Sequence, residues 1–288
     1  MKSALRKVIL FALLAMLASA CGQPTGNGMV IGVRPAAVSD ARTSVFEASS
    51  IDQMLGNEST YATSVDVIQE NAMAFGLLPI DTTLTVRQAE HLATLQLLGQ
   101  SIIQSRLTAI SKVRQQIASD KLLSYSQRYG ITSRLDRATA GLNSMQVKIA
   151  RDLLVDQTRA DVTAVAAFRV IGLLLPQAHL LVAAYDLVQV AAIYANQHNN
   201  LQQALYNSSL SGQSAIAAQA ILDDLARQVA TASRYGSTAS YQVNALTAAA
   251  YPGNRGMLKV ARQTVTAGKD ASSRAASDVS QLHAILGV

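Results

Sequence analysis

The sequence predicts an all-α protein, an elongated antiparallel helical bundle with coiled-coil-like seams and a flexible N-terminal tether. The 288 residues are half hydrophobic but include only 5 prolines, and none of these lies between Pro79 and Pro176 or between Pro176 and Pro252. Ala, Gln, Leu and Arg, which are good helix formers, dominate these stretches. Apolar residues recur there at steps of three and four, the spacing of a helix seam that faces a partner helix.

The first twenty residues have the order of a secretory signal peptide. A basic start (Lys2, Arg6 and Lys7) precedes an apolar run that is too short to span a bilayer, and residues 18–20 (Ala-Ser-Ala) precede the only cysteine, Cys21. We therefore expect residues 1–20 to be a signal peptide, residues 21–55 to be a tether and acidic N-terminal segment, and residues 56–288 to be the helical bundle domain.

Residues 17–21, Leu-Ala-Ser-Ala-Cys, resemble the lipobox of bacterial lipoproteins. The resemblance implies thioether lipidation of Cys21, cleavage before it and acylation of the new amino group. It departs from the usual pattern at Ala18, where the third residue before the cysteine is usually Leu. Residues 18–20 also satisfy an ordinary A-x-A cleavage site, so plain secretion is the alternative. Because stable anchoring needs more than one acyl chain, and a lipoprotein carries several, the resemblance implies an extracytoplasmic protein held on a membrane without crossing it.

The formal net charge of +6 includes the three basic residues of the leader. The chain that follows residue 20 has 21 basic and 18 acidic residues, a net charge of +3. This balance gives little support to a nucleic-acid partner, and export disfavours one further. A single cysteine excludes a disulfide framework and a thiolate metal cluster.

Two helices are expected over residues 86–118 and 125–152. Capping boxes precede them, Thr85 with Gln88 and Ser124 with Gln127, and the link between the helices is short, which predicts an antiparallel hairpin. Their seams at steps of three, four or seven are Ile103, Leu107, Ile110 and Ile117 in the first helix and Ile131, Leu135, Ala138, Leu142, Met145 and Ile149 in the second.

A third helix is expected from about residue 156 to beyond residue 194, a fourth over 214–249 and a last one over 255–286, after a break at residues 252–254 (Pro-Gly-Asn). The fourth has a seam of Leu222, Leu225, Val229 and Ala232. The last helix has a seam of small or apolar residues: Leu258, Ala261, Val265, Gly268, Ser272, Ala275, Val279, Leu282 and Leu286.

Residues 162–195 form the most hydrophobic segment after the leader. Between Arg169 and Asp186 no residue carries a formal charge unless His179 is protonated, but only 16 residues lie there, and Pro176, Gln177 and His179 interrupt them. We expect a helix buried by its neighbours and kinked at Pro176, with His179 as a hydrogen-bonded core residue. The alternative is a segment that inserts into a bilayer.

Charge is distributed in opposite blocks, with a net charge of −6 over residues 40–90 and +6 over residues 106–169. One interpretation is that the acidic segment packs along the basic hairpin. The other is a basic face that meets anionic lipid headgroups or envelope polymers.

No common catalytic or phosphate-binding motif is present, and we expect neither an enzyme nor a cofactor. Asp223 and Asp224 are adjacent on a helix and point in different directions, so they do not predict a carboxylate dyad. Asp152, Asp156 and Arg159 suit capping and ion pairing. The four histidines, His91, His179, His198 and His283, lie on separate segments, so no metal site is predicted.

Residues 100–286 resemble a family of exported helical bacterial proteins that is uncharacterised. Short motifs carry the likeness, in this order: Arg106-Leu107-Thr108, Lys121-Leu122-Leu123-Ser124, Gly141-Leu142, Lys148-Ile149, Arg159-Ala160-Asp161-Val162, Phe168-Arg169-Val170, Leu175-Pro176-Gln177 and Tyr251-Pro252-Gly253-Asn254. The resemblance implies an envelope location and an all-helical fold, and it implies no active site.

From these observations we expect a lipoprotein of the bacterial cell envelope with a structural or binding role, as a scaffold or adaptor. Its partners would be the membrane, through Cys21, and a protein or an anionic envelope polymer. One alternative is a membrane-active protein that inserts residues 162–195. The other is a small-ligand carrier or enzyme, which a deep pocket lined by His179 and Tyr185 would favour.

Overall fold

A computed structural model describes residues 86–288, which belong to one compact unit, Ser39–Val288. The predicted signal peptide, Cys21, the predicted tether, the acidic block up to residue 85 and the predicted Thr85 capping box lie outside the described residues. Within the described part every regular element is helical and no strand occurs, which confirms the all-α class. The α-helices are α4 (Val86–Ser119), α5 (Tyr125–Arg151), α6 (Val155–Ala164), α7 (Leu175–Asn207), α8 (Gly212–Asn244) and α9 (Arg255–Leu286).

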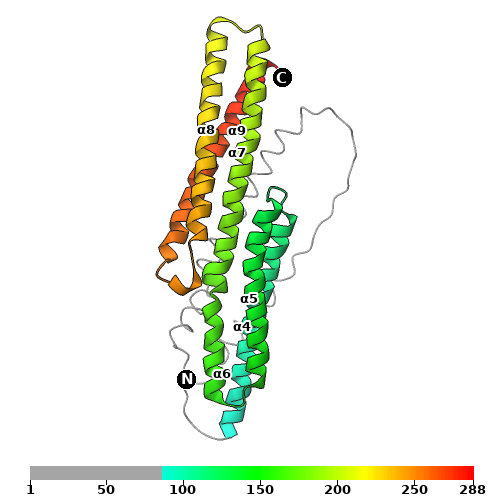
Figure 1. Cartoon of the computed structure of the whole chain (residues 1–288), viewed down its shortest axis with the longest axis vertical. Coiled ribbons are helices and arrows are strands. Elements are labelled where there is room, and N and C mark those ends of the chain that lie inside the picture. Colours follow the sequence, from blue (N-terminus) through cyan, green and yellow to red (C-terminus); the bar gives the residue numbers. More distant parts are fainter. Residues whose placement is uncertain (1–85) are drawn as a thin grey trace, which may run out of the picture. The chain divides into compact units, whose positions relative to one another are not determined.

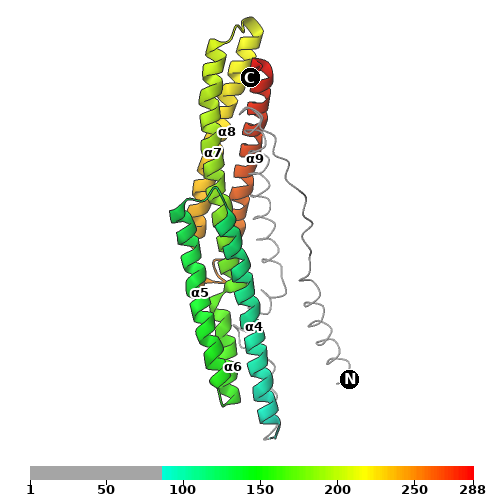
Figure 2. The same ribbon diagram turned by 90° about the vertical axis from the view of Figure 1, so that its right-hand side faces the viewer.

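The helices form two groups of three. Helices α4, α5 and α6 pack against one another, and so do α7, α8 and α9 (Figures 1 and 2). Helix α7 joins the two groups. Its N-terminal part packs against α4 and α5, and the rest of it packs against α8 and α9. Consecutive long helices run in opposite directions, so the packing is the expected antiparallel bundle.

The predicted seams lie in the core. Ile103, Ile110 and Ile117 of α4 are at most 1% exposed, and the α5 seam is buried except at Met145, which is half-buried. The α9 seam is buried from Leu258 to Leu282. The sequence rhythm therefore correctly identifies the face that each helix turns inward.

The hairpin between α4 and α5 is as predicted. The Ser124 hydroxyl accepts from the Gln127 backbone N–H, and the Gln127 side chain accepts from the Ser124 N–H, so the capping box is complete. The loop before it is closed by Asp120, whose carboxylate accepts from the backbone N–H groups of Leu122 and Leu123 at 2.8 and 3.3 Å. The Ser124 bond satisfies a donor that the start of α5 leaves open, and the Asp120 bonds hold the loop before it.

The prediction of one continuous third helix kinked at Pro176 is wrong. Helix α6 gives way to a 3-10 turn (Val165–Phe168), then to Arg169 in the left-handed region with φ of 49°, and then to a π-helical turn (Val170–Leu174). Pro176 lies in the first turn of α7. The π-helical turn runs directly into α7, since Leu174 and Leu175 are both in the right-handed helical region and the Leu175 N–H donates to the Val170 carbonyl. The interruption is thus at Arg169, and Pro176 lies where the π-helical turn passes into α7.

The fourth helix also ends earlier than expected, at Asn244 in place of residue 249, because Leu246 leaves the helix to enter the core, where it is 5% exposed. The predicted break at residues 252–254 and the last helix agree with the structure.

The apolar segment around Pro176 is a core helix of this fold. The span Val155–Asn207 is long and apolar enough to cross a membrane by length and composition, but 78% of its most apolar window is buried among the other helices. A core helix of a bundle passes the same test of composition, and the expected burial by neighbouring helices is confirmed.

Candidate functional site

Helices α7 and α8 form an open groove of about 430 Å³ between them. Small and apolar side chains make up most of its lining, with three polar residues at its edges. The lining residues are Val188, Ala191, Ala192, Ala195, His198 and Asn199 from α7 and Ala226, Val229, Ala230 and Ser233 from α8.

Small residues on facing helices produce this groove. Nearer the middle of the bundle, Gly236 lets α8 approach α7 so closely that an added Cβ would lie 2.7 Å from the Ala184 carbonyl oxygen. Ala191, Ala232 and Ala271 form a small buried cluster at the contact of the three helices. Further toward the α7–α8 loop, alanines also occupy the outward positions, and their side chains are too short to fill the space between the helices.

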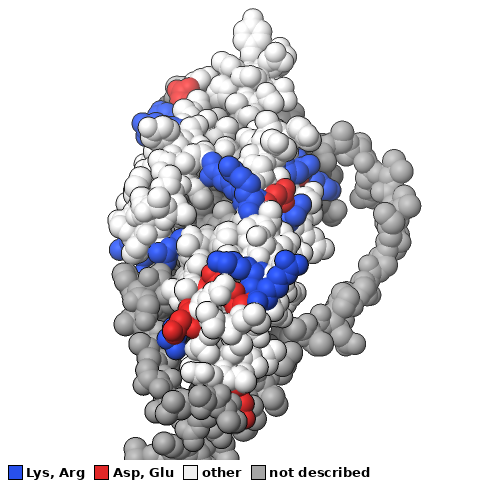
Figure 3. Space-filling model, turned by 60° about the horizontal axis from the view of Figure 1, so that its bottom comes forward, with Lys and Arg blue, Asp and Glu red and all other residues white. Residues whose placement is uncertain are grey.

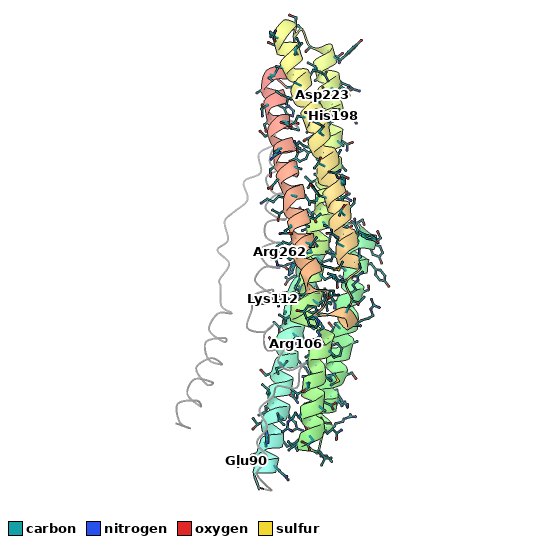
Figure 4. The ribbon with its side chains drawn as sticks, turned by 90° about the vertical axis from the view of Figure 1, so that its left-hand side faces the viewer. Glu90, Arg106, Lys112, His198, Asp223 and Arg262 are labelled. Carbon is teal, nitrogen blue, oxygen red and sulfur yellow. The ribbon has the colours of Figure 1, made fainter. Side chains whose placement is uncertain are left out.

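The groove carries no formal charge. None of its lining residues is Asp, Glu, Lys or Arg, and none of these types occurs between Asp186 and Asp223. Its polar groups belong to Ser233, His198 and Asn199. His198 Nδ1 lies 3.4 Å from Asn199 Oδ1. Figure 4 shows His198 and Asp223 at similar heights along the bundle, toward the α7–α8 loop. The groove therefore suits a neutral partner surface of small side chains better than a polyanion or a charged metabolite.

His179 and Tyr185 do not line the α7–α8 groove. His179 is 1% exposed, and burial lowers the pKa of its imidazole to about 4, so this side chain is neutral at physiological pH. The Tyr185 hydroxyl lies 3.5 Å from the Asn244 amide nitrogen at the surface. His179 is therefore a core residue, whereas the Tyr185 hydroxyl points to a contact at the surface.

Gln177 has a structural role that its sequence position did not reveal. Its side-chain amide is buried and donates to the Val243 carbonyl oxygen at 2.8 Å and to the Leu246 carbonyl oxygen at 3.3 Å. Gln96 does the same for α5, donating to the Ile149 and Asp152 carbonyls at 3.2 and 2.9 Å. Both glutamines therefore add side-chain donors at the C-terminal end of a neighbouring helix, where the Val243 and Ile149 carbonyls otherwise accept from the backbone N–H groups of Leu246 and Asp152.

The acidic residues singled out in the sequence have the expected structural roles. Asp223 is exposed and accepts from the Gln219 amide at 2.8 Å, whereas Asp224 pairs with Arg227 at 2.9 Å, so the two carboxylates do not act together. Asp156 and Arg159 form an ion pair at 3.3 Å, and Asp152 is the C-cap of α5.

At the α5–α6 junction two buried aspartates form a charge cluster with the exposed Lys148, which the sequence pattern did not reveal. Lys148 Nζ lies 2.6 Å from Asp161 Oδ1, and Asp161 and Asp152 are only 6% and 3% exposed. Burial, and next the negative charge of Asp161, raise the pKa of the Asp152 carboxyl. The hydrogen bond with Asp161 raises the pKa of the Lys148 ammonium. The step of four from Lys148 to Asp152 is visible in the sequence, but the fold of α6 onto α5 is needed to add Asp161.

The histidines do not converge. His91 is on α4, His179 and His198 are both on α7, and His283 is on α9. Among residues 86–288 no three His, Cys, Asp or Glu side chains are grouped in a way that could hold a metal ion.

Charges of both signs share the surface of the α4–α6 group. Figure 3 shows Lys and Arg side chains in several groups with Asp and Glu between them. Within the predicted basic block, Arg114, Lys148 and Arg159 each pair with an aspartate, Asp136, Asp161 and Asp156 respectively. The acidic segment proposed to cover this block lies largely outside the described residues.

No family model matches the chain, and the searches of curated proteins and of solved structures also found no match.

Proposed function

We propose that this protein is a non-enzymatic scaffold or adaptor of the bacterial cell envelope, held at a membrane through Cys21, and that the α7–α8 groove is the face it presents to its partner. The groove carries this proposal. It is open, it is formed by residues of two rigid helices, and its lining has no charged side chain. Interface cores are typically depleted of charged residues in this way.

The chemistry of the lining specifies the partner. Ala192, Ala195, Ala226 and Ala230 offer close approach to a backbone, and Asn199 and Ser233 offer hydrogen bonds at the edge. A helix or loop with small, uncharged side chains fits this surface, as in helix-in-groove recognition. The proposed location rests on the signal-like leader and on the lipobox-like residues 17–21.

Replacing groove alanines with glutamate tests the assignment of the partner face. In a capture experiment from envelopes, Ala192→Glu and Ala226→Glu should each abolish recovery of a partner that the parent protein retains, because a buried, unpaired carboxylate is costly. Ala93→Glu is the matched control, since Ala93 is an exposed helical alanine on α4. Equal recovery with all three variants would contradict the groove as the partner site.

Fractionation tests the anchor separately. Cys21→Ser should move the protein from the membrane fraction to the soluble extracytoplasmic fraction and abolish incorporation of labelled fatty acid. A variant that stays in the membrane fraction would show that Cys21 does not anchor the chain.

A further inference from the structure

Eight residues form a row along the outer side of α8, the side that faces away from the core, and we call this row the α8 stripe. Its members recur at alternating steps of four and three over almost the whole helix, and two of the eight are both large and apolar. They are Ile216, Ala220, Asp223, Arg227, Ala230, Arg234, Ser237 and Tyr241. All eight are exposed, including the two large apolar members, Ile216 at 64% and Tyr241 at 79%. No described helix covers this row, because the residues that α8 buries against its neighbours lie on its other side.

The stripe is complementary to itself when it is read in the opposite direction. If two copies of α8 pack antiparallel about a twofold axis between residues 228 and 229, Ile216 meets Tyr241, Ala220 meets Ser237, Asp223 meets Arg234 and Arg227 meets Ala230. Every member then pairs with another member of the same stripe. Each pair also joins the two alternating kinds of seam position, as antiparallel coiled-coil packing requires. A twofold contact uses the same patch on both partners, so one such stripe is sufficient.

The charges agree with this register. Asp223 of each copy faces Arg234 of the other, which gives two opposite-charge contacts per pair of helices. Within the described residues neither side chain has an ion-pair partner. Asp223 accepts only from Gln219, and the Arg234 guanidinium lies over the neighbouring Tyr235 ring, 5.6 Å from its centroid. Arg227, the residue nearest the axis, already has Asp224 at 2.9 Å in its own chain, which reduces repulsion between the two arginines.

The stripe has short side chains at Ala220, Ala230 and Ser237, and its bulky apolar residues, Ile216 and Tyr241, lie only at its ends. In the antiparallel register the long side chain of each Arg227 faces the short side chain of an Ala230. We propose that the α8 stripe is a self-association surface that binds the α8 stripe of a second copy of this chain, antiparallel and with twofold symmetry. Ala230 also lines the α7–α8 groove, so a second copy bound here would cover part of the α8 wall of the groove.

Charge exchange tests both the surface and the register. Sedimentation equilibrium of the purified full chain should show a monomer–dimer equilibrium. Asp223→Arg and Arg234→Asp should each weaken the dimer at least about tenfold, because each converts two attractive contacts into repulsive ones. The double variant Asp223→Arg/Arg234→Asp should restore the parent dissociation constant to within a few-fold, since it reverses both contacts. Raising the salt concentration should weaken the parent dimer.

Asp270→Arg and Arg274→Asp on the exposed part of α9 are the matched controls, with the same changes of charge on a different helix. They should dimerise as the parent does. A parent protein that is monomeric at every concentration, single variants that dimerise as tightly as the parent, or a double variant no better than the singles would each overturn the proposal. Open-ended polymers would also overturn it, because a twofold contact closes at two copies. A groove partner that fails to appear would leave these dimerisation results unchanged, so the two proposals fail separately.

Discussion

The side-chain amide of Gln177, in the first turn of α7, lies 2.8 Å from the carbonyl oxygen of Val243, at the end of α8. The same amide reaches the Leu246 carbonyl at 3.3 Å, and Gln177 is 5% exposed. One buried side chain therefore determines where α8 can end and ties that end to the interrupted segment before α7.

Replacing Gln177 with Leu should destabilise the protein, because the Leu246 carbonyl would lose this donor and the Val243 carbonyl would keep only backbone donors such as the Leu246 N–H, 3.2 Å away. We expect a loss of about 1–3 kcal/mol in the free energy of unfolding. Urea denaturation followed by circular dichroism measures it. Gln203→Leu, at an exposed position of α7, is the control and should change stability by less than about 0.5 kcal/mol. Equal effects of the two substitutions would argue against the capping role.

Two glycines should respond oppositely to alanine. At Gly236 a Cβ would lie 2.7 Å from the Ala184 carbonyl oxygen and 2.9 Å from Val188 Cγ2, so Gly236→Ala should cost about 1–3 kcal/mol of stability. At Gly130 in α5 nothing lies within 4 Å, so Gly130→Ala should add about 0.5–1 kcal/mol by improving the helix. Thermal unfolding of both variants distinguishes close helix packing at Gly236 from a general effect of glycine.

His179 should make the protein less stable in mild acid. Burial lowers the pKa of its imidazole to about 4 from an ordinary value of 6.5, so the unfolded chain takes up the proton first as the pH falls. Stability from this group is complete above pH 6.5 and is lost between pH 6.5 and 4, up to roughly 3 kcal/mol. We expect His179→Gln to remove this part of the pH dependence of unfolding, and His91→Gln to keep it. A parent protein whose loss of stability in this range matches that of His179→Gln would contradict a buried neutral imidazole.

Titration of Asp152 should have the opposite effect on folding stability, which should fall as the pH rises. Its pKa is raised, so the folded protein holds this proton more tightly than the unfolded chain does, and stability is lost as the pH rises through the folded pKa. Asp152→Asn imitates the protonated form. Its stability relative to the parent should therefore be greatest at neutral pH, and the difference should shrink as the pH falls toward 3.8, the ordinary value of this carboxyl. A difference that does not vary with pH would show that the carboxyl titrates normally.

The periodic parts of the fold were predictable from sequence, and the parts set by single side chains were not. Steps of three and four identified the buried faces of α4, α5 and α9, because core packing imposes that rhythm on every turn. The interruption at Arg169 has no such rhythm. It depends on a left-handed residue whose guanidinium lies over the Tyr251 ring, 5.4 Å from the centroid, in a contact between segments far apart in the chain. Pro176 was the visible signal, but it lies where the π-helical turn passes into α7.

The same distinction applies to the candidate site. The sequence shows that no formal charge occurs between Asp186 and Asp223, and this pattern could have indicated a neutral surface. It does not show that alanines of α7 and α8 stand opposite one another, since that depends on how closely Gly236 lets the helices approach. His179, which the sequence made conspicuous, is a core residue, whereas His198 borders the groove.

Site-specific photocrosslinking in intact cells tests the central claim, that the α7–α8 groove is the partner face, most directly. With a photoreactive residue at Ala226, we predict a discrete adduct of one mass that is lost when Ala192→Glu is added, and no adduct from the same residue at Ala93 on α4. An adduct at Ala226 that persists with Ala192→Glu, or equal labelling from both positions, would contradict the claim.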